Sequence, residues 1–101
     1  MNGTTHWTVP ADHPAFAGHF PGTPILPGVV LLDTVLHAIG AATGIALDRC
    51  EISSVKFLHP AGPGDELAIE HIVSASGSIR FEIVAGTRKI ASGSIVPGAP
   101  A

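Results

Sequence analysis

The chain has 101 residues, of which 46% are hydrophobic and 13% charged, and five Lys and Arg against eight Asp and Glu give a net charge of −3. This size and composition predict one compact domain over residues 1–101, with no room for a second domain. The shortage of cations excludes a protein that binds the phosphate backbone of nucleic acids.

The sequence predicts neither a targeting segment nor a membrane span. The first ten residues, MNGTTHWTVP, lack the basic and apolar stretches of a secretory signal. The longest apolar stretch, 29–47, is interrupted by polar residues and glycines, so a buried helix fits it better than a membrane span. The single cysteine, Cys50, excludes an intrachain disulfide and fits a reducing compartment. We therefore expect a cytoplasmic protein with no membrane contact.

The first half of the chain predicts a strand, a rigid loop and a helix. The strand covers 5–9 and ends before Pro10, and the loop at 11–28 is rich in proline and glycine. Prolines fix backbone angles and glycines adopt angles closed to other residues, so this loop should follow one irregular path. The helix covers 29–47 and is apolar on every side, which predicts that protein surrounds it.

The second half predicts four strands joined by short turns, at 51–59, 65–76, 78–86 and 87–96. In the third of these strands, Ile79, Phe81 and Ile83 alternate with charged residues, so one face should be buried and the other wet. His6, His59 and His71 lie on or at the ends of strands, where we expect them to face solvent. The sequence predicts an α+β fold with an antiparallel sheet around one central helix, and a frayed tail at 97–101.

Three groups around the loop could carry chemistry. His19, beside apolar residues, suits a neutral base. Asp33 lies inside an apolar helix, where we expect it to be buried, at a cost of several kcal/mol unless it is paired or protonated. Gly28 is predicted at the helix start, where free N–H groups can stabilise an oxyanion. Such a set could remove a proton next to a carbonyl and expel a β-hydroxyl. A structural alternative is that Asp33 is only satisfied locally, by a donor such as His37.

These residues carry a resemblance to a known family. The segment GHFPGTPILPGVVLLD resembles the signature of the β-hydroxyacyl-acyl-carrier-protein dehydratases: His-Phe-Pro-Gly, Pro, Pro-Gly-Val and an acid fourteen positions after the histidine. The segment VKFLHPAGPGDELAIE is similar to the strand–turn–strand that follows the central helix in that family, and the resemblance covers residues 6–96. It implies a hotdog fold. It also implies dehydration of a 3-hydroxyacyl thioester on acyl carrier protein, in fatty-acid or polyene-type synthesis, with no cofactor beyond the phosphopantetheine that carries the substrate.

The same resemblance implies residue roles and partners. His19 would take the α-proton, Asp33 would protonate the leaving hydroxyl, and the Gly28 N–H would polarise the thioester carbonyl. In the family, the histidine and the acid of one site come from opposite subunits, so a homodimer is implied. A higher oligomer and a heterodimer with a second hotdog protein stay open.

Two positions depart from the common pattern of the family. Asp33, in place of Glu, resembles the dehydratase/isomerase branch and the stand-alone dehydratases of aryl-polyene pathways. His37 stands where relatives often carry Gln, and is a candidate either to orient Asp33 or to replace it.

Other functions are compatible with parts of this pattern. A thioesterase of the same fold would use the acid to direct water onto the thioester. A non-catalytic hotdog subunit would only hold an acyl chain. A metal site at His13, His19, Asp33 and His37 lacks HExxH or paired-histidine spacing, so no metal is expected.

Overall fold

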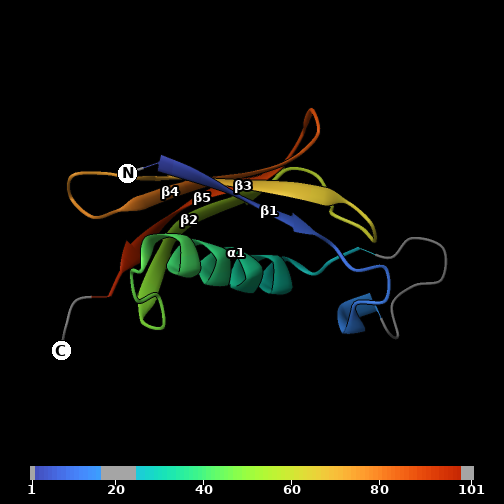
Figure 1. The fold of residues 1–101 in the computed structure, drawn as a ribbon, viewed down its shortest axis with the longest axis horizontal. Coiled ribbons are helices and arrows are strands. Elements are labelled where there is room, and N and C mark those ends of the chain that lie inside the picture. Colours follow the sequence, from blue (N-terminus) through green and yellow to red (C-terminus); the bar gives the residue numbers. More distant parts are fainter. Residues whose placement is uncertain (1, 17–24, 99–101) are drawn as a thin grey trace.

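The chain folds as one antiparallel sheet with a single long helix along one of its faces (Figure 1). A computed structural model describes residues 2–16 and 25–98. The strand order in the sheet is β1-β3-β4-β5-β2, which confirms the α+β class and the antiparallel sheet. The elements are β1 (Asn2–Thr8), the 3-10 turn η1 (Pro14–Phe16), α1 (Gly28–Thr43), β2 (Cys50–Phe57), β3 (Glu66–Val73), β4 (Ile79–Ala85) and β5 (Arg88–Pro97).

Helix α1 begins one residue before the predicted start at residue 29 and ends earlier than predicted. Pro27 precedes the first turn, and its carbonyl accepts the N–H groups of Val30 and Leu31 at 3.0 and 3.1 Å. At the other end, Gly44 adopts a left-handed conformation with φ of 75° and donates its N–H to the carbonyl of Gly40. The predicted extension to residue 47 is therefore wrong, because this glycine cap turns the chain away from the helix axis.

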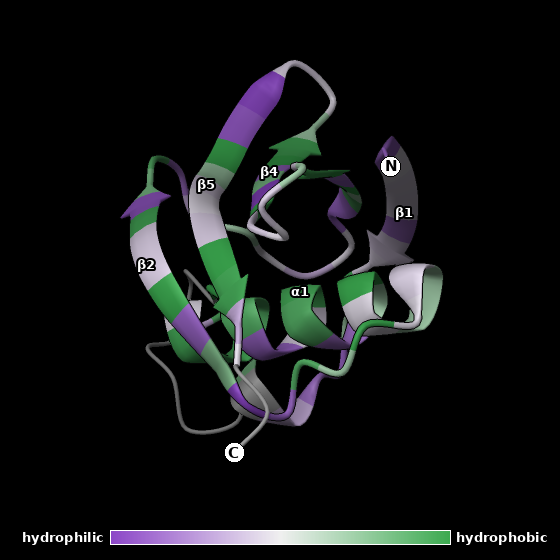
Figure 2. Ribbon diagram, turned by 90° about the vertical axis from the view of Figure 1, so that its left-hand side faces the viewer, coloured by the Kyte–Doolittle hydropathy of each residue, from purple (hydrophilic) through white to green (hydrophobic). Residues whose placement is uncertain are grey.

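The core lies between the sheet and one side of α1. The helix contributes Leu31, Val35 and Ile39, all buried. The strands curve over that side of the helix, and no described strand covers its other side (Figure 2). There Val29 is 75% exposed. The described residues therefore cover one face of the helix only, and within them the prediction that protein surrounds the helix is wrong.

The inner face of the sheet follows the predicted alternation. In β4, Ile79, Phe81 and Ile83 are buried, whereas Arg80 is exposed and Glu82 is partly so. Inward residues on neighbouring strands meet in register across the sheet, and Phe81 pairs with His71 on one side and Gly93 on the other.

His71 does not face solvent as predicted. It is 3% exposed, because it shares the inward phase of β3 with Leu67 and Ile69. Its Nδ1 is buried and has no hydrogen-bond partner among the described residues. His6 and His59 are exposed, as predicted.

Hydrogen bonds and an ion pair hold the turn between β2 and β3 and the end of β5 in place. Between β2 and β3, Asp65 Oδ2 accepts the N–H of Gly62 at 2.8 Å and contacts Arg88 at 3.1 Å. Pro97 pairs with Cys50 in the sheet and the Gly98 N–H reaches the carbonyl of Arg49, so these two residues do not belong to the predicted frayed tail. Within residues 2–16 and 25–98, no helix is long and apolar enough to cross a membrane.

Candidate active site

The first turn of α1 is anchored to the sheet side of the molecule. The N–H of Leu26 donates to the carbonyl of Ala61 at 2.7 Å, which fixes the chain just before the helix. Gly28 follows directly beneath the ring of Phe57, and a Cβ on this glycine would lie only 2.8 Å from Phe57 Cζ. A side chain at residue 28 would therefore displace the ring.

The backbone of this turn is suited to bind an oxygen atom with negative charge. Within the described residues, the N–H of Gly28 has no hydrogen-bond acceptor, as is usual for the first turn of a helix. The aligned peptide dipoles add partial positive charge at the same end. The structure thus places Gly28 at the helix start, as predicted, with a free donor.

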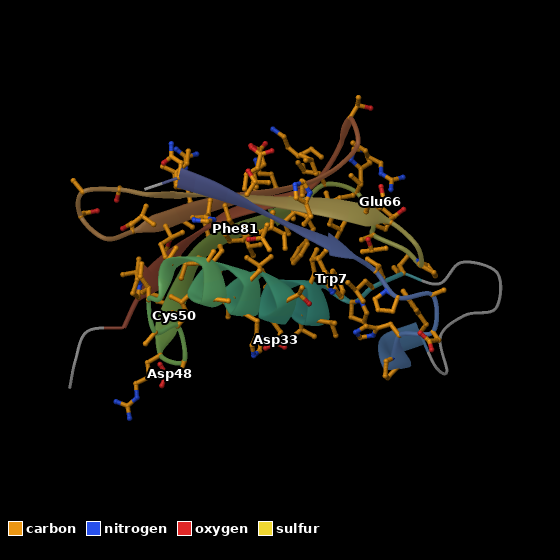
Figure 3. The ribbon with its side chains drawn as sticks, in the orientation of Figure 1. Trp7, Asp33, Asp48, Cys50, Glu66 and Phe81 are labelled. Atoms are coloured by element: carbon orange, nitrogen blue, oxygen red, sulfur yellow. The ribbon has the colours of Figure 1, made fainter. Side chains whose placement is uncertain are left out.

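Asp33 lies on the uncovered side of α1, and its side chain points away from the sheet (Figure 3). The side chain is 71% exposed, so the prediction of a buried acid is wrong for the isolated chain. The reason is the one-sided cover of the helix: the carboxylate shares its face with Val29, whereas Val35 and Ile39 face the sheet. We call Val29, Asp33, Leu36, His37 and Gly40 the open face of α1.

His37 is the neighbour of Asp33 on the open face. Its Nδ1 lies 2.9 Å from the backbone carbonyl of Asp33 and 3.5 Å from Asp33 Oδ2. The His37 side chain is 79% exposed. The hydrogen bond of the imidazole thus goes to the backbone of Asp33, and the carboxylate lies only within ion-pair distance of the same nitrogen.

A shallow hollow of about 470 Å³ runs along the open face, beyond Asp33. Apolar or small residues form much of its lining, and three ionisable side chains border it. The lining residues are Asp33, Leu36, His37, Gly40, Ala41, Leu47 and Asp48. Asp48 was not singled out from the sequence. It reaches the hollow because the chain reverses after the glycine cap at residue 44, and that glycine was the signal available.

The predicted site residues are only partly brought together by the described chain. Gly28 and Asp33 lie on one helix, five residues apart, which corresponds to about 7.5 Å of helix rise. His37 follows one turn later on the open face. His19 lies in 17–24, outside the described residues. Next to that segment, the ring of His13 contacts Trp7 and Phe16 edge-on, with centroid distances of 6.3 and 6.0 Å.

Comparison with known proteins identifies relatives over nearly the whole chain. A 3-hydroxyacyl-[acyl-carrier-protein] dehydratase FabZ from Chlamydia trachomatis is 35% identical over an alignment that covers 86% of this chain and 65% of the relative. The FabZ of Geobacter metallireducens is 38% identical over an alignment that covers 71% of this chain and 53% of the relative. The chain thus spans about two thirds or less of the length of these relatives.

Solved structures share the fold. A chain of the ApeI:P dehydratase heterocomplex from Xenorhabdus doucetiae superposes with a TM-score of 0.78 at 26% identity, over 94% of this chain and 85% of that one. A trans-AT PKS dehydratase domain from Brevibacillus brevis superposes with a TM-score of 0.82 over 99% of this chain and 40% of that one, and its 18% identity speaks for the fold alone. The fluoroacetyl-CoA thioesterase FlK superposes with a TM-score of 0.68 over 96% of this chain and 86% of that one. Its sequence identity is 17%, so this similarity also speaks for the fold alone. The fold is a hotdog fold, as predicted.

A family model completes the comparison. The model of the ApeI-like family, described as ApeI dehydratase, matches residues 2–94, which include the predicted signature segment and all but the last residues of the sheet. From this match and the dehydratase relatives it follows that the chain belongs to the ApeI-like dehydratase family.

Proposed function

We propose that the chain dehydrates a 3-hydroxyacyl thioester to the trans-2-enoyl thioester, with the acyl group carried on the phosphopantetheine of an acyl carrier protein. The observation that carries the proposal is the placement of Asp33, an acid on the open face of the same helix whose first turn offers the free N–H of Gly28. The names of the matched relatives, which are 3-hydroxyacyl-[acyl-carrier-protein] dehydratases, support the proposal.

Three protein groups perform the proposed reaction. His19 takes the α-proton, and the electrons of that C–H bond form the new double bond. The Gly28 N–H donates a hydrogen bond to the thioester oxygen as negative charge develops there. The carboxyl group of Asp33 protonates the β-hydroxyl, which leaves as water with the electrons of the C–O bond. The chain itself supplies the base, the acid and the oxyanion donor.

We propose further that a second copy of the chain covers the open face and brings its His19 to Asp33. Two exposed apolar regions support the proposal that a second chain binds here. Strand β2 is an edge of the sheet, and Val55, Phe57 and the adjacent Leu58 are exposed apolar residues along it. Val29 exposes a further apolar side chain on the open face. An unpaired apolar edge is a ready surface for pairing with another chain. Because one structural neighbour is a heterocomplex, a different hotdog protein as partner is the competing outcome of the tests below.

Hydration of an enoyl thioester, the reverse reaction, tests the proposed activity. Crotonyl-pantetheine should lose its enoyl absorbance without release of free thiol. Asp33→Asn and His19→Ala should each lower the rate by about 10²- to 10⁴-fold, the usual contribution of an acid or base. Both variants should keep the circular dichroism spectrum and thermal midpoint of the wild type. Release of free thiol would instead identify a thioesterase, and binding of the thioester without turnover an acyl-binding subunit.

A further inference from the structure

The turn between β2 and β3, residues 61–65, contacts two parts of the chain that are far apart in sequence and lie at the same end of the molecule (Figure 1). The N–H of Val9, just after β1, donates to the carbonyl of Asp65 at 2.9 Å, and an N–H of the turn donates back to the carbonyl of Val9 at 2.8 Å. The N–H of Leu26, just before α1, donates to the carbonyl of Ala61 at 2.7 Å. The turn therefore joins the end of β1 to the start of α1.

The two attachment points lie on either side of residues 10–25, the segment that carries His19. Val9 and Leu26, which precede and follow this segment, are 0% and 5% exposed. Hydrogen bonds in such a place are costly to break, because a buried N–H or carbonyl would be left without a partner. Both ends of the segment are therefore held by buried contacts with one turn.

The side chain of Asp65 keeps this turn closed. Its Oδ2 accepts the N–H of Gly62 at 2.8 Å, and the backbone N–H of Asp65 donates to the carbonyl of Gly62 at 3.2 Å. The same carboxylate oxygen accepts a hydrogen bond from Arg88 on β5 at 3.1 Å. Hydrogen bonds to an ionised acceptor are stronger than neutral ones. The carboxylate thus fixes both the shape of the turn and its place against β5.

The same turn is connected to the proposed oxyanion donor. Gly28 follows Leu26 by two residues, and the ring of the intervening Pro27 restricts its φ, which is −58°. The chain between the Ala61 contact and the Gly28 N–H has therefore few ways to bend. A shift of the turn would move this N–H, and an oxyanion donor is effective only at hydrogen-bond distance from the developing charge.

We propose that Asp65 is a positioning residue, whose carboxylate, by closing the turn, sets the place of the Gly28 N–H and of both ends of the segment that carries His19. This inference rests on the proposed dehydratase function. Asp65 acts on the reacting groups only through the backbone that the turn holds. Loss of the carboxylate should lower turnover by displacing those groups, since a displacement of about 1 Å can cost about 10²-fold in rate.

Steady-state hydration of crotonyl-pantetheine tests this role. Asp65→Ala should lower kcat by about tenfold or more, with KM changed less than about twofold, because misplaced groups affect the transition state more than substrate binding. Asp65→Asn should recover most of the lost kcat, since its amide oxygen can accept both hydrogen bonds. Glu82→Ala is the matched control, because Glu82, on β4, pairs with Lys89, the residue after Arg88. It should leave both constants unchanged.

Amide hydrogen exchange gives a readout that does not depend on turnover. In Asp65→Ala, the N–H groups of Val9 and Leu26 should exchange at least about tenfold faster than in the wild type, because the opened turn no longer holds them. The N–H of Ile83, in the central strand β4, should keep its wild-type rate. Glu82→Ala should change none of the three rates.

The outcomes separate this inference from the proposed function. Asp65→Ala with wild-type kcat, beside an inactive Asp33→Asn, would overturn the positioning role and leave the proposed function intact. A fall in kcat without faster exchange at Leu26, or with equally faster exchange at Ile83, would also overturn it, since Asp65 would then act elsewhere or on the whole sheet. Asp65→Asn as slow as Asp65→Ala would do the same, because the turn would not explain the loss. If Asp33→Asn were itself fully active, the proposed function would fail.

Discussion

Gly28 lies where the ring of Phe57 crosses the first turn of α1. The sequence selects this glycine for its free N–H at the predicted helix start, and that placement is correct. Packing gives a second reason for a glycine here, because β2 places the ring of Phe57, 29 residues further along the chain, against this position. Local sequence patterns carry no information on that approach. One residue thus meets a local requirement that could be predicted and a tertiary one that could not.

His71 gives a prediction about stability. Replacement by Leu removes a buried nitrogen that has no partner among the described residues, while the side chain stays similar in volume. We expect the free energy of unfolding, measured by urea denaturation, to rise by about 1–2 kcal/mol, because an unsatisfied buried polar group is costly. The exposed His6, replaced by Leu on β1, is the control and should change stability by less than about 0.5 kcal/mol. A loss of stability in His71→Leu would show that the folded protein satisfies this nitrogen.

The sequence predicted the burial of Asp33 and of His71 wrongly, in opposite directions. For His71, the signal was present: Leu67 and Ile69 precede it in the same phase of the strand, so the period of two places it inward. For Asp33, no local signal was available. A helix that is apolar all round must be covered, but whether its own chain or a partner covers it depends on how much sheet the chain can supply.

Among the elements, helix α1 offers two glycines whose replacement by alanine should have opposite effects on stability: Gly44 at its C-terminal cap and Gly40 inside it. Gly44 caps the helix with φ of 75°, a conformation that alanine adopts only with strain, so Gly44→Ala should lower the free energy of unfolding by about 1 kcal/mol. Gly40 lies inside the helix, and a Cβ there would meet nothing closer than the carbonyl of Ile45 at 3.5 Å. Gly40→Ala should therefore raise stability by about 0.5–1 kcal/mol. Urea denaturation of both variants measures the two effects, and equal signs would contradict the assigned cap.

The strands were easier to predict than the helix end. Short turns with glycine and proline separate β2, β3, β4 and β5, and the alternation within β4 gives its buried face directly. The stretch after residue 43 is as apolar as the helix itself, so composition alone extends the helix through it. The helix ends four residues before the predicted boundary because Gly44 adopts a left-handed conformation, which composition does not reveal.

The exposed apolar edge of β2 leads to a prediction about how two chains associate. Val55 is partly exposed on this edge strand, and a lysine there should oppose pairing with a second chain. Ile72 is an exposed apolar residue of similar size on β3, which already has β1 and β4 as neighbours. Sedimentation velocity should show a dimer for the wild type and Ile72→Lys, and a smaller species for Val55→Lys. Dissociation of Ile72→Lys with an intact Val55→Lys dimer would place the contact on the outer face of the sheet instead.

In the molecule as a whole, the described residues leave one side of the candidate site open to solvent. The sheet covers one side of α1, and the side that carries Asp33 is open (Figures 2 and 3). The exposed side chain of His37 lies next to Asp33. The exposed apolar edge at β2 and the exposed Val29 describe a surface that a second copy would bury. His19 and Asp33 of one site are therefore proposed to belong to different chains.

Mixing two inactive variants shows whether one site is shared between two chains. Equal amounts of His19→Ala and Asp33→Asn, unfolded and refolded together, should give half mixed dimers by random association, each with one intact and one doubly damaged site. Hydration of crotonyl-pantetheine should then recover to about one quarter of the wild-type rate per chain, the fraction expected for a two-fold symmetric dimer with shared sites. Each variant refolded alone should stay inactive. A mixture that stays as inactive as its components, although native mass spectrometry shows mixed dimers, would contradict the shared site.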